Sequence, residues 1–101
     1  MANRTSYVAG LLLCLMAVSS VRAQVTIDVS KITCKEMLHD TFTVPENIAY
    51  WLNGYYSAKR ANTVFDVAGF KENAAKVQDY CLHNQDVTVM KAAEVLFGVS
   101  R

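Results

Sequence analysis

Apolar residues in the middle of the chain recur at the spacing of an amphipathic helix. Over residues 43–60 this spacing places five side chains on one helix face: Ile48, Trp51, Leu52, Tyr55 and Tyr56. Thr43 and Glu46 have the spacing of a capping box, and Pro45 suits a first helical turn. We therefore predict a central helix whose aromatic face forms the middle of a small core. Gly54 would mark either a close helix contact or a frayed helix end.

Two further helices are predicted on either side of this segment. Thr33 and Glu36 form a second capping box, so a short helix is expected over residues 33–39, with Ile32 packing onto Met37. A longer helix is expected over residues 68–83. Its apolar face would carry Phe70, Ala74, Val77 and Cys81.

The end of the chain predicts a fourth helix. Asp86 or Thr88 would cap it, and Gly98 would stop it after Phe97. Its apolar positions are Val89, Ala93, Leu96 and Phe97. Residues 64–67 are strand-like but have no second strand to pair with, so we expect an extended connector that buries Val64 or Phe65 against the central helix. The pattern indicates an all-α fold.

The first residues have the order of a secretory signal peptide. Arg4 precedes an apolar run over residues 8–18, and Val21-Arg22-Ala23 fits a cleavage site before Gln24. The apolar run is shorter than the roughly 20 residues that span a bilayer. We expect residues 1–23 to be removed, leaving a single domain over residues 24–101 without a membrane anchor. A lipid anchor on Cys14 is a minor alternative.

Removal of the signal peptide leaves two cysteines, Cys34 and Cys81, in a chain bound for an oxidising compartment. A disulfide between them would restrict the unfolded chain and so stabilise the fold by roughly 4 kcal/mol. Small domains with small cores often need such a cross-link. A metal site that uses both cysteines competes with this interpretation. Neither the cysteines nor His39 and His83 have the CxxC or HxxxH spacing typical of such sites, so no metal or cofactor is expected.

Charge and motifs argue against nucleic-acid binding and against catalysis. Without Arg4 and Arg22, eight basic residues face nine acidic ones, and no basic patch indicates nucleic acid. In acid, once the carboxylates are neutral, the basic residues and both histidines would give about +10, and such a charge loosens a small domain. No catalytic triad, phosphate loop or metal motif is present, so we do not expect an enzyme.

Several motifs, taken in order, resemble one family. They are Thr33-Cys34-Lys35-Glu36, the single Pro45 before an apolar helix, the segment from Val64 to Gly69, and Val77-Gln78-Asp79-Tyr80-Cys81. The ordered set resembles the HdeA/HdeB family of small periplasmic acid-stress chaperones, and the segment over residues 48–52 is similar to the HdeB branch. The tail over residues 92–101 lacks the lysines common at the termini of this family.

The resemblance implies a small four-helix orthogonal bundle, stapled by one disulfide, that forms a homodimer near neutral pH. It also implies an ATP-independent holdase that loosens in acid and binds acid-unfolded periplasmic proteins. By matching position, the client-binding residues would be Val44, Ile48, Ala49, Tyr50, Trp51, Leu52, Val64, Phe65, Val67 and Phe70. The periodicity makes the same residues core, so acid would have to expose them. The alternative is a constitutive periplasmic binding protein, such as an immunity protein against a secreted peptidoglycan-cleaving toxin.

Overall fold

The computed structural model describes residues 25–99, which form one short 3-10 turn and four α-helices. In chain order these are η1 (Val29–Lys31), α2 (Cys34–Leu38), α3 (Pro45–Lys59), α4 (Val67–His83) and α5 (Val89–Phe97). The all-α fold expected from the sequence is confirmed. The predicted signal peptide, including Cys14, lies outside the described residues.

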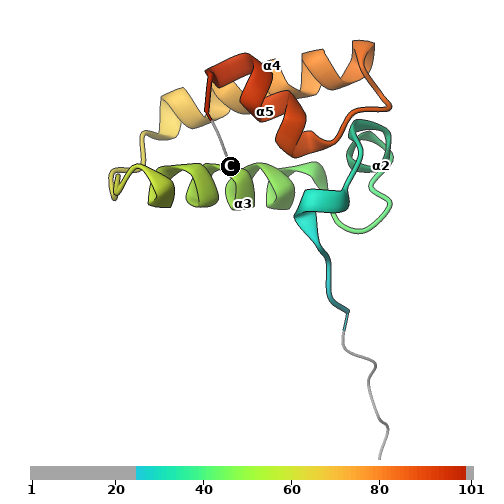
Figure 1. Ribbon diagram of the computed structural model, residues 1–101, viewed down its shortest axis with the longest axis horizontal. Coiled ribbons are helices and arrows are strands. Elements are labelled where there is room, and N and C mark those ends of the chain that lie inside the picture. Colours follow the sequence, from blue (N-terminus) through green and yellow to red (C-terminus); the bar gives the residue numbers. More distant parts are fainter. Residues whose placement is uncertain (1–24, 100–101) are drawn as a thin grey trace, which may run out of the picture.

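The two long helices lie side by side and run in opposite directions (Figure 1). The connector between α3 and α4 lies at one end of the molecule, and α2 lies at the other. Helix α5 packs mainly against α4. This arrangement gives the bundle an end closed by α2 and an end formed only by the α3–α4 connector.

The start of α2 is tied to the start of α5 by backbone hydrogen bonds. The Cys34 amide donates to the Val87 carbonyl at 2.8 Å, and the Val89 amide donates to the Ile32 carbonyl at 2.9 Å. The predicted capping box is confirmed, because Thr33 Oγ1 accepts from the Glu36 amide while Glu36 Oε1 accepts from the Thr33 amide. The two backbone hydrogen bonds between α2 and α5 therefore join residues far apart in sequence without involving a charged group.

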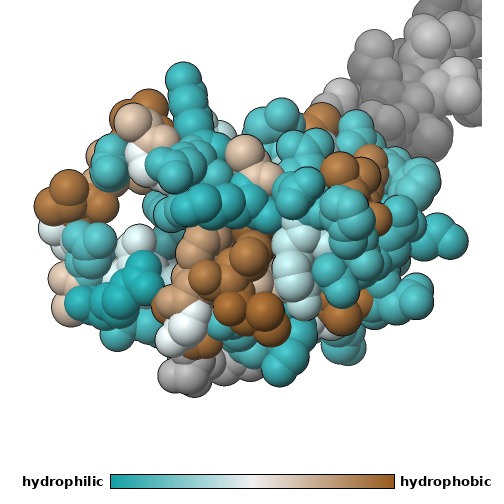
Figure 2. Space-filling view, turned by 90° about the horizontal axis from the view of Figure 1, so that it is seen from above, coloured by the Kyte–Doolittle hydropathy of each residue, from teal (hydrophilic) through white to brown (hydrophobic). Residues whose placement is uncertain are grey.

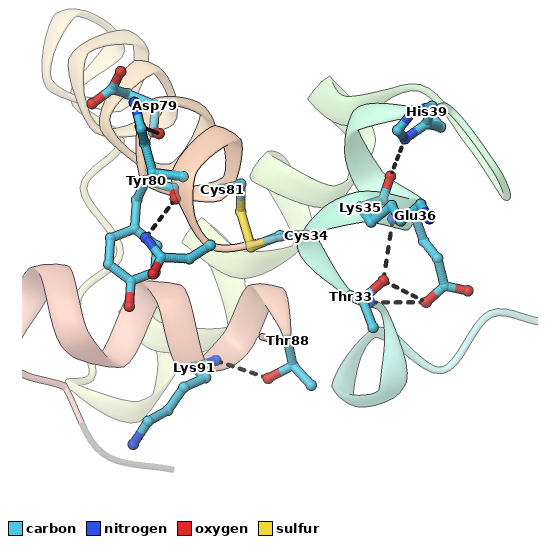
Figure 3. The surroundings of a disulfide bond; sticks show 12 residues. Thr33, Cys34, Lys35, Glu36, His39, Asp79, Tyr80, Cys81, Thr88 and Lys91 are labelled. Atoms are coloured by element: carbon cyan, nitrogen blue, oxygen red, sulfur yellow. Dashed lines mark hydrogen bonds between the residues drawn. A yellow bond between two sulfur atoms is a disulfide. The ribbon is translucent and has the colours of Figure 1, made fainter. Parts of the chain in front are cut away.

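The disulfide reinforces the same junction (Figure 3). Cys34 begins α2, Cys81 lies near the end of α4, and their Cα atoms are 4.9 Å apart. Both side chains are completely buried. The metal-site alternative for these two cysteines is wrong, because their sulfur atoms are bonded to each other.

The core surrounds this disulfide. Ile32, Val89 and the two cysteines are its most deeply buried side chains. Helix α3 contributes a single stripe with a spacing of four residues, namely Ile48, Leu52 and Tyr56. The expectation of a core centred on the whole aromatic face of α3 is wrong, because Trp51 remains 42% exposed.

Helix α3 also begins differently from the predicted capping box. Val44 is the N-cap and no side chain caps this terminus, whereas Thr43 Oγ1 accepts a 2.8 Å hydrogen bond from Asn47 Nδ2. Pro45 occupies the first turn as expected, and its fixed φ sets the start without a side-chain cap. Of the two alternatives for Gly54, the close helix contact is absent, because nothing lies within 4 Å of the Cβ position there.

The connector and α4 meet at Asp66, which the sequence analysis did not identify as a cap. Asp66 Oδ1 accepts a 3.2 Å hydrogen bond from the Gly69 amide, and α4 begins at Val67, one residue earlier than expected. A Cβ atom on Gly69 would lie 2.6 Å from Asp66 Oδ2, so glycine leaves the space that the capping carboxylate occupies. The connector is extended as expected, but Val64 and Phe65 are 73% and 46% exposed, so the predicted burial of one of them is wrong.

Helix α5 has the termini that the sequence predicts. Thr88, one of the two predicted caps, accepts a 3.1 Å hydrogen bond from the Lys91 amide. Gly98 ends the helix in the left-handed conformation with φ 63°. Val89 and Ala93 are buried as predicted, together with Met90 and Ala92, whereas Phe97 remains exposed.

Candidate client-binding surface

Most of the residues assigned to client binding are accessible in the folded chain. Six of the ten are exposed: Val44, Tyr50, Trp51, Val64, Phe65 and Val67. Ala49 and Phe70 are half-buried, and only Ile48 and Leu52 lie in the core. The expectation that all ten form the core is therefore wrong for the exposed six, which are accessible in the single folded chain.

Three aromatic rings join α3, the connector and α4. Tyr50 stacks on Phe70 with ring centroids 4.6 Å apart, and Phe65 lies 5.3 Å from Phe70 and 6.2 Å from Tyr50. We call Tyr50, Phe65 and Phe70 the aromatic cluster. Such pairs are held by both apolar burial and ring geometry. The cluster tethers the connector, yet leaves two of its three rings exposed.

A second aromatic row follows α3 at a spacing of four residues. Trp51 stacks on Tyr55 with centroids 4.9 Å apart, and Lys59 Nζ lies 5.2 Å from the Tyr55 ring centroid. Tyr55 also meets the edge of Tyr56, whose hydroxyl donates to the Met90 carbonyl at 3.4 Å. Trp51 therefore packs on Tyr55, which in turn contacts the buried Tyr56, while Trp51 itself stays exposed. Tyr55 belongs to this surface but was absent from the predicted site.

A partly open pocket of about 480 Å³ lies between α3 and α4, beside the end of α5. Its walls include Ala49, Leu52, Phe70, Ala74, Val77 and Phe97. We call it the interhelix pocket. The sequence analysis missed it, because periodicity places side chains on a helix face but does not say how far the neighbouring helix lies. Tyr50 and Phe70 belong to both the pocket and the aromatic cluster.

Helix α5 adds further apolar surface. Val95 and Phe97 are 53% and 36% exposed. Figure 2 shows a hydrophobic patch surrounded by hydrophilic residues in the middle of the face where α5 lies. No residue of α5 was among the predicted client-binding residues, although the sequence does show apolar residues at 95–97.

Ion pairs between the described residues contribute little to the stability of the folded chain at neutral pH. One ion pair joins two described residues, an exposed contact of 3.3 Å between Lys76 Nζ and Glu72 Oε1. The Ser30 hydroxyl and amide both donate to Asp28, and these hydrogen bonds, with nearby Lys31, lower the pKa of this carboxyl. Asp28, Glu36 and Asp66 act instead as hydrogen-bond acceptors at the starts of η1, α2 and α4.

Each histidine ring lies beside a backbone carbonyl of its own helix. Nδ1 of His39 lies 2.7 Å from the Lys35 carbonyl, and Nδ1 of His83 lies 3.0 Å from the Asp79 carbonyl. Each ring, when Nδ1 carries the proton, can donate a hydrogen bond to a carbonyl near the end of its own helix. Among residues 25–99 no three histidine, cysteine, aspartate or glutamate side chains are grouped as metal ligands. The same residues include no helix long and apolar enough to cross a membrane.

Comparison with known proteins assigns the chain to a family. The model of the HdeA/HdeB family matches residues 5–91, which is most of the sequence. The chain belongs to the HdeA/HdeB family. This is a family of periplasmic acid-stress chaperones that bind unfolded client proteins. No curated protein and no solved structure matches the chain.

Proposed function

We propose that this HdeA/HdeB family protein is an ATP-independent holdase of the periplasm that loosens in acid and binds unfolded proteins through the aromatic surface of α3, the connector and α4. The observation that carries the proposal is the position of that surface. It lies around a connector that no cross-link secures, whereas the disulfide and the backbone hydrogen bonds secure the opposite end. Apolar patches rimmed by polar residues are typical of protein-binding sites.

Net charge explains the proposed acid response better than salt bridges do. Since the ion pair between Glu72 and Lys76 is exposed, its loss changes stability by about 1 kcal/mol at most. With the carboxylates neutral, the remaining lysines, arginines and histidines repel one another. The α3–α4 end then opens first.

The disulfide limits how far this opening goes. Cys34 and Cys81 do not titrate once bonded, so acid leaves the link between α2 and α4 in place. The closed loop restricts the unfolded chain and keeps the aromatic segments of one molecule near each other. The same link favours return to the native fold after neutralisation.

The proposal includes export and self-association. Cleavage after Ala23 would leave residues 24–101 in the periplasm, which intact mass measurement of the periplasmic protein tests directly. A homodimer near neutral pH would cover part of the exposed aromatic surface, and sedimentation at pH 7 tests it. If the protein is a monomer at pH 7 and still binds clients in acid, the homodimer is refuted and the holdase function stands.

Light scattering of an acid-denatured client at pH 2 to 3 tests the main proposal. We expect the mature protein to suppress aggregation at near-equimolar ratio, and the double variant Tyr50→Ser, Trp51→Ser to suppress it less. Leu82→Ser is the matched control, since Leu82 is 55% exposed but lies near the end of α4, away from the connector. Equal suppression by all three proteins would contradict the assigned surface, and no suppression by the native protein would contradict the function.

A further inference from the structure

Asn53 and Gly54 form the one Asn-Gly pair in the sequence, and the pair lies inside α3. Both residue types are poor helix formers. No packing contact offsets this cost at the glycine, because Gly54 is exposed and a Cβ atom on it would meet nothing within 4 Å. The pair is therefore a weak point of α3 that packing does not explain.

An asparagine followed by a glycine is chemically labile in a flexible chain. The backbone nitrogen of the glycine, once it has lost its proton to hydroxide, attacks the side-chain carbonyl carbon of the asparagine. The side-chain nitrogen takes up a proton and leaves as ammonia. Water then opens the resulting cyclic succinimide at either carbonyl, which gives aspartate or isoaspartate. Glycine favours the first step because it has no side chain to hinder the ring closure.

The helix keeps the two reacting groups of this pair apart. In an α-helix ψ is about −42°, and the amide of Gly54 points along the helix axis towards the carbonyl of Tyr50. Reaction needs the attacking nitrogen and the side-chain carbon to be close and aligned. Space is not the constraint, because Asn53 is half-buried and lines both the interhelix pocket and a smaller pocket beside the connector. The backbone conformation of α3 therefore restrains the reaction.

Helix α3 can open without breaking the covalent link. The disulfide joins α2 to α4, and α3 contains no cysteine. Burial of Ile48, Leu52 and Tyr56 holds α3 in place, and the connector that follows it is exposed over residues 61–66. Elements held in this way open locally, and the rate of chemistry in the open form follows the population of that form.

We propose that Asn53 is a site of intramolecular deamidation that reacts only when α3 opens and is protected by the helix in the folded chain. The step forms a bond between the Gly54 nitrogen and Asn53 Cγ, breaks the bond from Cγ to Nδ2, and consumes one water for each ammonia released. Aspartate as the product adds a negative charge in the middle of α3. Isoaspartate adds an atom to the backbone between Trp51 and Tyr55, so the stack of these two rings, with centroids 4.9 Å apart, is lost.

This inference does not rest on the holdase function, because any opening of α3 at neutral pH exposes the pair. A homodimer that covers α3 would add to the protection and leave the site unchanged. A protein that deamidates at Asn53 when unfolded, but does not suppress aggregation in acid, would contradict the proposed function and leave this inference standing.

Incubation of the mature protein at pH 8 and 37 °C, in native buffer and in guanidinium chloride, tests the site. Digestion with pepsin in acid stops the base-dependent step, and mass spectrometry then quantifies the deamidation of each asparagine. We expect Asn53 to react faster than any other asparagine in guanidinium chloride, and at least about 10-fold more slowly in native buffer. Equal rates at Asn53 in the two buffers would refute the protection by α3. Absence of product at Asn53 in guanidinium chloride would refute the site.

Variants of the pair test the chemistry in guanidinium chloride. Asn53→Gln should abolish the product at this position, since the longer side chain closes a less favourable ring. Asn62→Gln on the connector is the matched control and should leave the rate at Asn53 unchanged. Gly54→Ala should slow the reaction severalfold, and in native buffer it should raise the urea midpoint, because nothing in the fold opposes the added Cβ. An undiminished rate in Gly54→Ala would overturn the role of the glycine.

Core variants test whether opening of α3 controls the rate in native buffer. Ile48→Val removes a buried methyl group and should raise the rate at Asn53 about 2- to 10-fold, and Leu52→Ala should raise it further. Leu82→Ser on the exposed side of α4 is the control and should leave the rate unchanged. Circular dichroism at pH 8 verifies folding, and Ile48→Val carries the comparison if Leu52→Ala does not fold. An unchanged rate in folded Ile48→Val would refute control by opening.

Discussion

The capping contact between Asp66 and Gly69 allows a quantitative test of what secures the connector end. Replacement of Asp66 by alanine removes the acceptor of the Gly69 amide, and loss of such a cap costs about 1 kcal/mol. Removal of the negative charge from the helix start adds about 0.3 to 1 kcal/mol. We therefore expect Asp66→Ala to lower the free energy of unfolding at pH 7 by about 1 to 2 kcal/mol.

The substitution Gly69→Ala separates two effects on stability, the loss of the Asp66 cap and the higher helix propensity of alanine. Alanine is favoured over glycine inside a helix by about 1 kcal/mol, but its Cβ would lie 2.6 Å from Asp66 Oδ2 and would displace the capping carboxylate. The two effects nearly cancel in the native background. In the Asp66→Ala background only the favourable effect remains, so Gly69→Ala should then stabilise the protein by about 1 kcal/mol.

Urea unfolding of the four proteins of this double-mutant cycle, followed by far-UV circular dichroism at pH 7, measures the coupling. We expect about 1 kcal/mol between the two sites. Asp66→Asn is the control that retains a capping side chain without the charge, and it should cost less than Asp66→Ala. Additive effects of the two substitutions would refute the cap as the reason for glycine at position 69.

Other substitutions test separate parts of the structure. Ala61 has φ 52°, so Ala61→Gly should stabilise the protein by up to about 1 kcal/mol in urea unfolding, whereas Ala58→Gly inside α3 should destabilise it by a similar amount. Leu52→Ala should cost about 2 to 5 kcal/mol because Leu52 is buried, while Trp51→Ala should cost less and should mainly reduce client holding. The folded-state pKa of Asp28 is below its usual value, so Asp28 contributes stability above that usual value, and this contribution is lost as the pH falls through the folded-state pKa. Asp28→Asn should therefore reduce stability at pH 6 and have little effect near pH 2, and an equal effect at both values would contradict this pH linkage.

Much of the fold could be predicted because its signals are local. A capping box, a threonine cap and a glycine stop act within one helical turn, and they are correct at Thr33, Thr88 and Gly98. The pairing of Cys34 with Cys81 followed from elimination, as only these two remain after the expected cleavage. Asp66 was missed although Gly69 follows it at capping distance, because the apolar residues around it favoured a later helix start.

What could not be predicted is which part of a helix face its neighbours cover. Ile48, Leu52 and Tyr56 form one stripe of α3, and Trp51 and Tyr55 form the next stripe around the same helix. Both are apolar, so sequence periodicity treats them alike. In a domain of this size the surface is large relative to the volume, and the other helices cover only the first stripe. The sequence by itself determined the helices, their ends and the covalent link; the tertiary structure alone decided which aromatic rings remain exposed and that a pocket lies between α3 and α4, because both depend on the distances between elements.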